Sequence, residues 1–66
     1  MNVHTFIIPE KSEKYLEVFE SIIRKYGTRI SKTSTKDGTI YEIEFDSSSL
    51  MDNCKTAISQ QIPNLY

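Results

Sequence analysis

An Asp-Gly dipeptide between two strand-like runs constrains the fold of this chain more than any other feature. Asp37-Gly38 separates residues 28–35 from residues 39–45, and both runs are rich in β-branched residues. A two-residue Asp-Gly loop supplies the positive φ angles of a type I′ turn, which joins adjacent antiparallel strands. The sequence therefore predicts a β-hairpin in which Asp37 and Gly38 form the loop.

This turn also predicts which side chains share a face of the hairpin. The predicted pairs on one face are Lys36 with Thr39, Ser34 with Tyr41, Lys32 with Ile43 and Ile30 with Phe45. On the other face, Thr35, Thr33, Ser31 and Arg29 lie opposite Ile40, Glu42, Glu44 and Asp46. We expect the first face to be buried, because it carries most of the apolar side chains.

A further strand is predicted over residues 2–8, and neither of its faces is polar. Its two alternating sets are Val3, Thr5 and Ile7, and His4, Phe6 and Ile8. A strand that is apolar on both faces is usually covered on both, but a chain of 66 residues has few elements for that purpose. A one-residue shift would exchange the two faces, so either one is a candidate for burial. The face left open is a candidate partner surface.

The first helix is predicted from apolar residues that repeat every three or four positions. It follows Ser12 as its N-cap, or begins earlier with Pro9 in its first turn, and Gly27 lies at its C-terminal end. The apolar stripe of this helix consists of Tyr15, Leu16, Phe19, Ile22, Ile23 and Tyr26.

A second helix is predicted from about Leu50 to Gln61. Ser49 and Asp52 fit the loose pattern of a capping box at its start, and Pro63 stops it. Its buried side consists of Leu50, Met51, Cys54, Ala57 and Ile58. The remaining residues, 62–66, form a C-terminal tail that lies against the sheet edge or frays.

These elements predict a single α+β domain over residues 1–66, in the order β-α-β-β-α. A right-handed crossover from the first strand gives a three-stranded sheet of order 1-3-2 with both helices on one face. This is a ferredoxin-like arrangement that lacks its last strand, an analogy at the level of the fold alone. The first strand is then an open edge of the sheet.

Composition and charge restrict the class of protein. The formal net charge of −1 argues against a general polyanion binder, and no apolar run is long enough to span a membrane. Cys54 is the only cysteine, so no internal disulfide forms, and we expect a cytoplasmic protein without a signal segment. We also expect dimerisation to compensate for the small core.

The charges are nevertheless unevenly distributed along the chain. Five basic residues and no acidic residue lie between positions 24 and 36, and five acidic residues with no basic one lie between positions 37 and 52. The two groups would neutralise each other across the hairpin, or the basic group would contact an acidic partner. That group, called the basic block below, consists of Arg24, Lys25, Arg29, Lys32 and Lys36.

Motifs that would indicate catalysis, a metal or a cofactor are missing from the sequence. His4 is the only histidine and has no ligand pair at a recognisable spacing, and Cys54 is predicted to be a buried, inert thiol. Glu42 and Glu44 form a carboxylate pair on one strand, more typical of a solvated face than of acid–base catalysis. No glycine-rich phosphate loop occurs. We predict no catalytic residue, no metal and no cofactor.

The sequence favours a non-enzymatic protein-binding module, an inhibitor or regulator like those of phages and mobile elements. The first strand is apolar on both faces, and the chain has too few elements to cover both. This predicts a homodimer or a protein partner. The predicted partner or dimer interface consists of His4, Phe6, Ile7, Ile8, Ile40, Leu65 and Tyr66. The alternative is nucleic-acid binding by the basic block.

Overall fold

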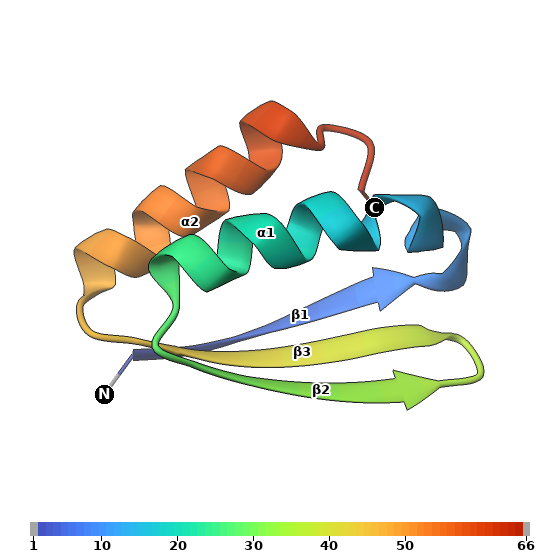
Figure 1. Ribbon diagram of the computed structural model, residues 1–66, viewed down its shortest axis with the longest axis horizontal. Helices are drawn as coiled ribbons and strands as arrows, with labels where there is room; N and C mark the ends of the chain where they lie inside the picture. The colour runs from blue at the N-terminus through green and yellow to red at the C-terminus, as the bar shows by residue number, and fades with distance from the viewer. Residues whose placement is uncertain (1, 66) are drawn as a thin grey trace.

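The computed structural model describes residues 2–65 and contains an antiparallel sheet covered by helices (Figure 1). The strands lie in the order β1-β3-β2, with β3 antiparallel to both neighbours. In chain order the elements are β1 (Asn2–Pro9), the 3-10 helix η1 (Glu10–Tyr15), α1 (Leu16–Tyr26), β2 (Arg29–Thr35), β3 (Gly38–Phe45) and α2 (Ser48–Gln61). The predicted α+β class and the strand order 1-3-2 are confirmed.

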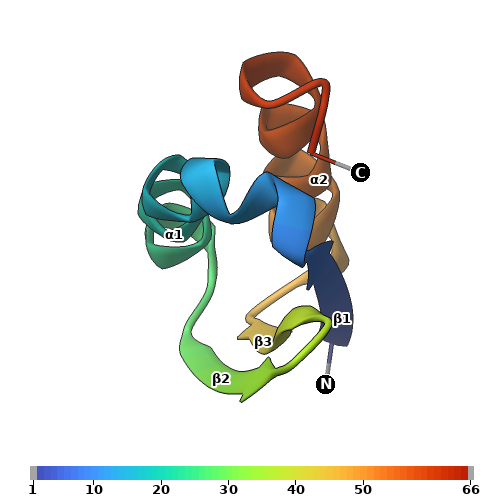
Figure 2. The same cartoon turned by 90° about the vertical axis from the view of Figure 1, so that its right-hand side faces the viewer.

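Both helices pack on the same face of the sheet, so the molecule has two layers (Figure 2). The apolar stripe of α1 contributes Phe19, Ile22 and Ile23 to the core between the layers, as predicted. The other buried apolar side chains are Phe6, Ile8, Tyr41, Ile43, Phe45, Cys54, Ala57, Ile58, Ile62 and Leu65. The tail therefore does not fray at Ile62 and Leu65, which are buried in this core.

The structure decides which face of β1 is covered. Phe6 and Ile8 are buried, whereas Val3, Thr5 and Ile7 are exposed on the opposite side of the strand. The helix-free face of the sheet on that side is called the open face below. The open face extends over all three strands, since Ile7 of β1 pairs with Ile40 of β3, and Ile40 pairs with Thr33 of β2.

The helical region begins directly after Pro9, close to the earlier of the two predicted starts. Ser12 is not an N-cap, because the chain enters a 3-10 helix directly after Pro9. The Ser12 side chain is buried instead, and its hydroxyl donates a hydrogen bond to the backbone carbonyl of Leu65. This bond joins the start of the helical region to the C-terminal tail, a contact between distant positions that local capping rules do not predict.

Helix α2 begins earlier than predicted. Ser47, rather than Ser49, is its N-cap, and the Ser47 hydroxyl accepts a hydrogen bond from the backbone N–H of Leu50 at 3.2 Å. Several consecutive serines offer alternative caps, and a shift of two residues selects between them. The end of the helix at Gln61, before Pro63, agrees with the prediction.

The hairpin forms, but its predicted loop and register are wrong. Thr35 pairs with Gly38, so Lys36 and Asp37 form the loop, and Ile30 lies opposite Ile43 rather than Phe45. Among residues 2–65, no residue other than glycine has a positive φ, which excludes a type I′ turn at this position. The shift of two positions keeps each side chain on its predicted face, because side chains alternate with a period of two.

Gly27 follows the last residue of α1, but it has no left-handed conformation. Its φ is −86°, and its N–H donates to the carbonyl of Ile23 at 2.8 Å. A Cβ at this position would lie 2.6 Å from Cγ2 of Ile43. The glycine is therefore needed for a close approach of the helix end to the sheet.

Candidate functional site

The open face is apolar along β1 and polar along β2. Ile7 is 63% exposed and Val3 is 45% exposed, and they are among the large apolar side chains that the fold leaves in water. Ile40 of β3 is half-buried beside Ile7. These three side chains form an apolar strip next to the sheet edge, called the β1 strip below.

Part of the predicted interface lies elsewhere. Phe6, Ile8 and Leu65 are buried in the core of the chain itself, so their assignment to a partner surface is corrected. Phe6 and Ile8 are buried because the helices cover the even-numbered side of β1. Leu65 is buried in the tail, where its backbone carbonyl accepts a hydrogen bond from Ser12. His4 is half-buried on that same side, with its ring 4.5 Å from the ring of Phe6. Tyr66 lies outside the described residues.

Burial and a nearby charge also affect the imidazole of His4. Loss of solvent lowers its pKa, and the positive charge of Lys55 lowers it further. A lowered pKa favours the neutral ring at neutral pH. Within residues 2–65 there is no group of three or more His, Cys, Asp or Glu side chains that would hold a metal ion.

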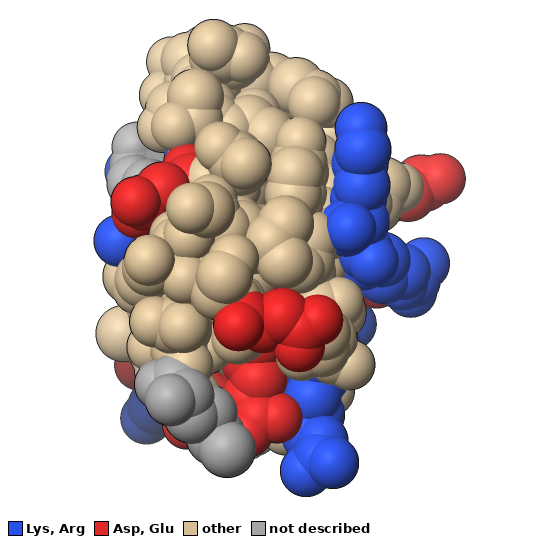
Figure 3. Space-filling view, turned by 90° about the vertical axis from the view of Figure 1, so that its left-hand side faces the viewer, with Lys and Arg blue, Asp and Glu red and all other residues tan. Residues whose placement is uncertain are grey.

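The basic block is partly neutralised by carboxylates. Arg29 lies 3.5 Å from a carboxylate oxygen of Glu44 across the strands, on the open face. Figure 3 shows Lys and Arg side chains gathered along one margin of the molecule, where α1 ends and β2 begins, with acidic side chains nearby. The members of the block are mainly exposed, but the acidic residues limit the basic excess that they offer to a partner.

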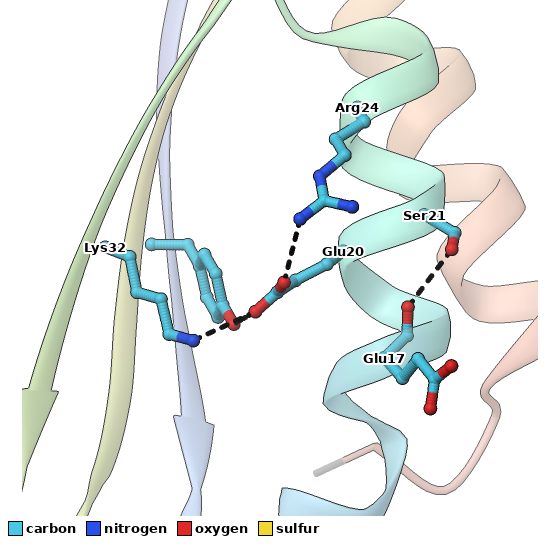
Figure 4. A network of polar contacts seen from close by, with 6 residues as sticks. Glu17, Glu20, Ser21, Arg24 and Lys32 are labelled. Atoms are coloured by element: carbon cyan, nitrogen blue, oxygen red, sulfur yellow. Dashed lines mark hydrogen bonds and ion pairs between the residues drawn. The ribbon is translucent and has the colours of Figure 1, made fainter.

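Glu20 of α1 is the centre of a polar network between helix and sheet (Figure 4). Its carboxylate accepts hydrogen bonds from the hydroxyl of Tyr41 at 2.6 Å and from Nζ of Lys32 at 3.0 Å. Arg24 donates to the second oxygen at 3.3 Å. The inward position of Lys32 on the apolar face is explained by this carboxylate, with the amine 5.9 Å from the centre of the Tyr41 ring.

The network shifts the pKa values of its members in opposite directions. The hydrogen bond from Tyr41, followed by that from Lys32, lowers the pKa of Glu20 below its ordinary value. Burial and the hydrogen bond to Glu20 raise the pKa of Tyr41. Both shifts stabilise an ionised Glu20 beside a neutral Tyr41, which indicates a structural clamp between α1 and the sheet rather than a proton-transfer pair.

Stability is therefore expected to depend on Glu20 in acid. Because its pKa is depressed in the folded state, Glu20 stabilises the fold above pH 4.5, and this contribution is lost as the pH falls through the folded value. Glu20→Gln should lower the free energy of unfolding by about 1 to 2 kcal/mol at pH 7 and flatten the acid limb of the stability curve. Urea unfolding between pH 2 and 7 measures this.

Glu17 provides the matched control for that measurement. It lies on the same helix and is exposed, and its carboxylate makes none of the contacts of the network in Figure 4. Glu17→Gln should keep the acid limb of the natural chain. An equal flattening in both variants would show that Glu20 is not responsible.

Cys54 is fully buried, and burial raises the pKa of its thiol to about 11. At pH 8 only about one molecule in a thousand then carries a thiolate, the reactive form. We expect the folded protein to react with a water-soluble disulfide reagent at least about 100-fold more slowly than the urea-unfolded protein. Equal rates, followed spectroscopically at several pH values, would contradict a buried thiol.

The tip of the hairpin borders a groove of about 250 Å³. Leu16 contributes an apolar side chain to it, and the backbone N–H of Glu10 donates to the carbonyl of Asp37 nearby at 3.1 Å. The remaining lining residues are Pro9, Glu10, Glu13, Ser34, Thr35, Lys36, Gly38 and Thr39. These groups have mixed charge, so the groove suggests no particular ligand.

The structure does not join the two predicted surfaces, the β1 strip and the basic block, into one site. Of the basic block, only Arg29 and Lys32 lie on β2, at the sheet edge opposite β1, because β3 separates the two strands. Arg24 and Lys25 lie on α1, and Lys36 lies in the hairpin loop. Across residues 2–65, the helices are too short or too polar to cross a membrane. Comparisons of the chain with protein-family models, with curated proteins and with solved structures found no match.

Proposed function

We propose that this chain is a small, non-enzymatic protein-binding module that acts as a stoichiometric inhibitor or regulator through the β1 edge of its sheet. The observation that carries the proposal is the exposure of Val3 and Ile7 in an edge strand that has no Lys, Arg, Asp or Glu. An unpaired strand edge beside exposed apolar side chains is suited to pairing with a strand of another protein.

The arrangement of the strands supports the same surface. The strands lie in the order β1-β3-β2 with both helices on one face (Figure 2), and we compare this arrangement, by analogy alone, with a ferredoxin-like fold that lacks its last strand. In the complete fold, the last strand pairs with the outer edge of the first. By this analogy, a partner strand would occupy the same place beside β1.

The state of the polar side chains supports binding rather than catalysis. The carboxylate of Glu20 is engaged by Tyr41, Lys32 and Arg24, and the thiol of Cys54 is buried. Glu44 of the carboxylate pair contacts Arg29. The two carboxylates already have structural partners and the thiol is buried, so they do not form a set of free polar groups converging on a pocket.

The basic block supports two further proposals of lower weight, contact with an acidic partner and nucleic-acid binding. Arg24, Arg29 and Lys32 each contact a carboxylate, which reduces the charge available to phosphate groups. Retention of single-stranded DNA that weakens steeply with salt and disappears in the Arg29→Glu, Lys32→Glu variant would favour the nucleic-acid proposal.

A photo-crosslinking side chain at position 7 tests the main proposal in the cells that produce the chain. We expect a covalent adduct of defined mass. An excess of untagged natural chain should compete for the partner and reduce the adduct, whereas an excess of the untagged Ile7→Glu variant should not. The same probe at Thr33, exposed on the same face but at the opposite edge, is the control. Equal adducts at both positions, or none at position 7, would refute binding at β1.

A further inference from the structure

The two edges of the sheet differ in their protection against pairing with another strand. β2 carries Arg29 and Lys32 and is exposed at all seven positions. Two β2 strands paired symmetrically would bring these cations together, and an inward lysine is a common device against edge pairing. β1 carries no such charge over Asn2–Pro9. Of the two edges, only β1 is therefore suited to pairing with the same strand of a second copy.

The exposed side chains of β1 also match each other when the strand is placed antiparallel to itself. In a symmetric pair centred on Thr5, Val3 lies opposite Ile7 of the second copy, and Ile7 lies opposite its Val3. Both are exposed and aliphatic in the single chain, at 45% and 63%. The two-fold axis thus produces two aliphatic cross-strand pairs on the open face. In each pair, Ile7 also lies beside Ile40 of its own chain.

We infer that the partner of β1 is a second copy of this chain, joined by antiparallel β1–β1 pairing centred on Thr5. The three strands of each copy then form one continuous sheet, in which both helical layers lie on the same side. This inference rests on the same exposed β1 edge as the proposed function, and it names a second copy, in place of a different protein, as the occupant of that edge. Because β1 is uncharged, the association should be insensitive to salt.

Sedimentation equilibrium of the purified chain tests the assembly. We expect a dimer whose dissociation constant changes less than about threefold between low and high salt. Ile7→Lys should raise that constant about tenfold or more, because it removes two cross-strand pairs and places charges at the joint. Thr33→Lys, the same new charge on the same face at the β2 edge, should leave the constant unchanged. A monomer at all concentrations would overturn the inference.

Cysteine crosslinking tests the register. Thr5→Cys should form a covalent dimer on mild oxidation, since a residue on the two-fold axis faces its own copy within about 4.5 to 5.5 Å between Cβ atoms. An equimolar mixture of Val3→Cys and Ile7→Cys should crosslink between the two variants. The natural chain is the control, because its buried Cys54 should not react. A dimer that crosslinks through Thr33→Cys and not through Thr5→Cys would overturn the inference.

The two proposals fail in different ways. A monomeric purified chain that still gives a specific adduct at position 7 with a different protein would refute the homodimer and support the protein-binding module. A purified dimer with the predicted register, whose adduct at position 7 contains only this chain, would support the homodimer and remove binding of a different partner at β1.

Discussion

Replacing Phe19 by alanine is expected to lower the free energy of unfolding by about 3 to 5 kcal/mol. The Phe19 side chain has no exposed surface, and its ring centre lies 5.3 Å from that of Phe6 and 4.8 Å from that of Tyr41. Its removal leaves a cavity between helix and sheet, bordered by the rings of Phe6 on β1 and Tyr41 on β3. A chain of this length has about 3 to 10 kcal/mol of stability in total, so the loss is about a third of that total or more.

Urea unfolding followed by circular dichroism measures this effect. Phe19→Leu gives a milder change that keeps the measurement possible if the alanine variant does not fold, with an expected loss of about 1 to 2 kcal/mol. Val18→Ala is the control, because Val18 is the neighbouring residue and 44% exposed, and its loss should stay within about 0.5 kcal/mol. Similar losses at positions 18 and 19 would contradict the packing of α1 on the sheet.

The burial of Phe19 was predictable because it depends on periodicity. The helical repeat of the residues around Phe19 and the alternation of Tyr41, Ile43 and Phe45 each select one face, and both faces are buried. The strand order was predicted by placing the first strand beside the third after a right-handed crossover, and this order is confirmed. Patterns that repeat over many residues are not disturbed by a local error, so these predictions were confirmed although the hairpin register was wrong.

The covered side of β1 could not be predicted from the same patterns. Val3 and Ile7 are as apolar as Phe6 and Ile8, so alternation does not distinguish the two sides. The pairing of β1 with β3 and the packing of the helices decide it, and both involve residues far apart in the sequence. For that reason the predicted interface included side chains that belong to the core.

The network at Glu20 was only partly accessible to sequence reasoning. The contact between Glu20 and Arg24 follows from their helical spacing. The signal for the rest was the presence of Tyr41 and Lys32 on a face predicted to be buried, since a buried hydroxyl and an inward amine both need an acceptor. Choosing Glu20 among the acidic residues needs the placement of α1 over the sheet, which no local pattern contains.

The hairpin loop shows a different limit. Asp-Gly is a strong signal for a two-residue turn, and the loop does contain two residues, Lys36 and Asp37. Gly38 lies directly after the loop and not within it, as the first residue of β3. There its φ is +154°, and it lies beside Pro9 of β1. The glycine meets a requirement set by a third strand, which a hairpin rule does not consider.

Replacing Gly38 by alanine is therefore expected to lower the free energy of unfolding by about 2 to 4 kcal/mol. An alanine Cβ would lie 2.2 Å from the carbonyl oxygen of Ile8, a backbone atom that cannot rotate away. The positive φ adds strain for any residue with a Cβ. Relief requires β1 to move away from β3, so the substitution should also weaken contacts that depend on the β1 edge.

Asp37→Ala distinguishes this explanation from the turn that the sequence suggests. A type I′ turn over Asp37 and Gly38 would require a positive φ at Asp37, and alanine there would be strained. In the structure Asp37 does not have a positive φ, its side chain is exposed, and its backbone carbonyl accepts from Glu10 whatever the side chain is. Asp37→Ala should then cost less than about 0.5 to 1 kcal/mol. A larger loss for Asp37→Ala than for Gly38→Ala in urea unfolding would instead support the type I′ register, and would contradict the close contact between Gly38 and β1.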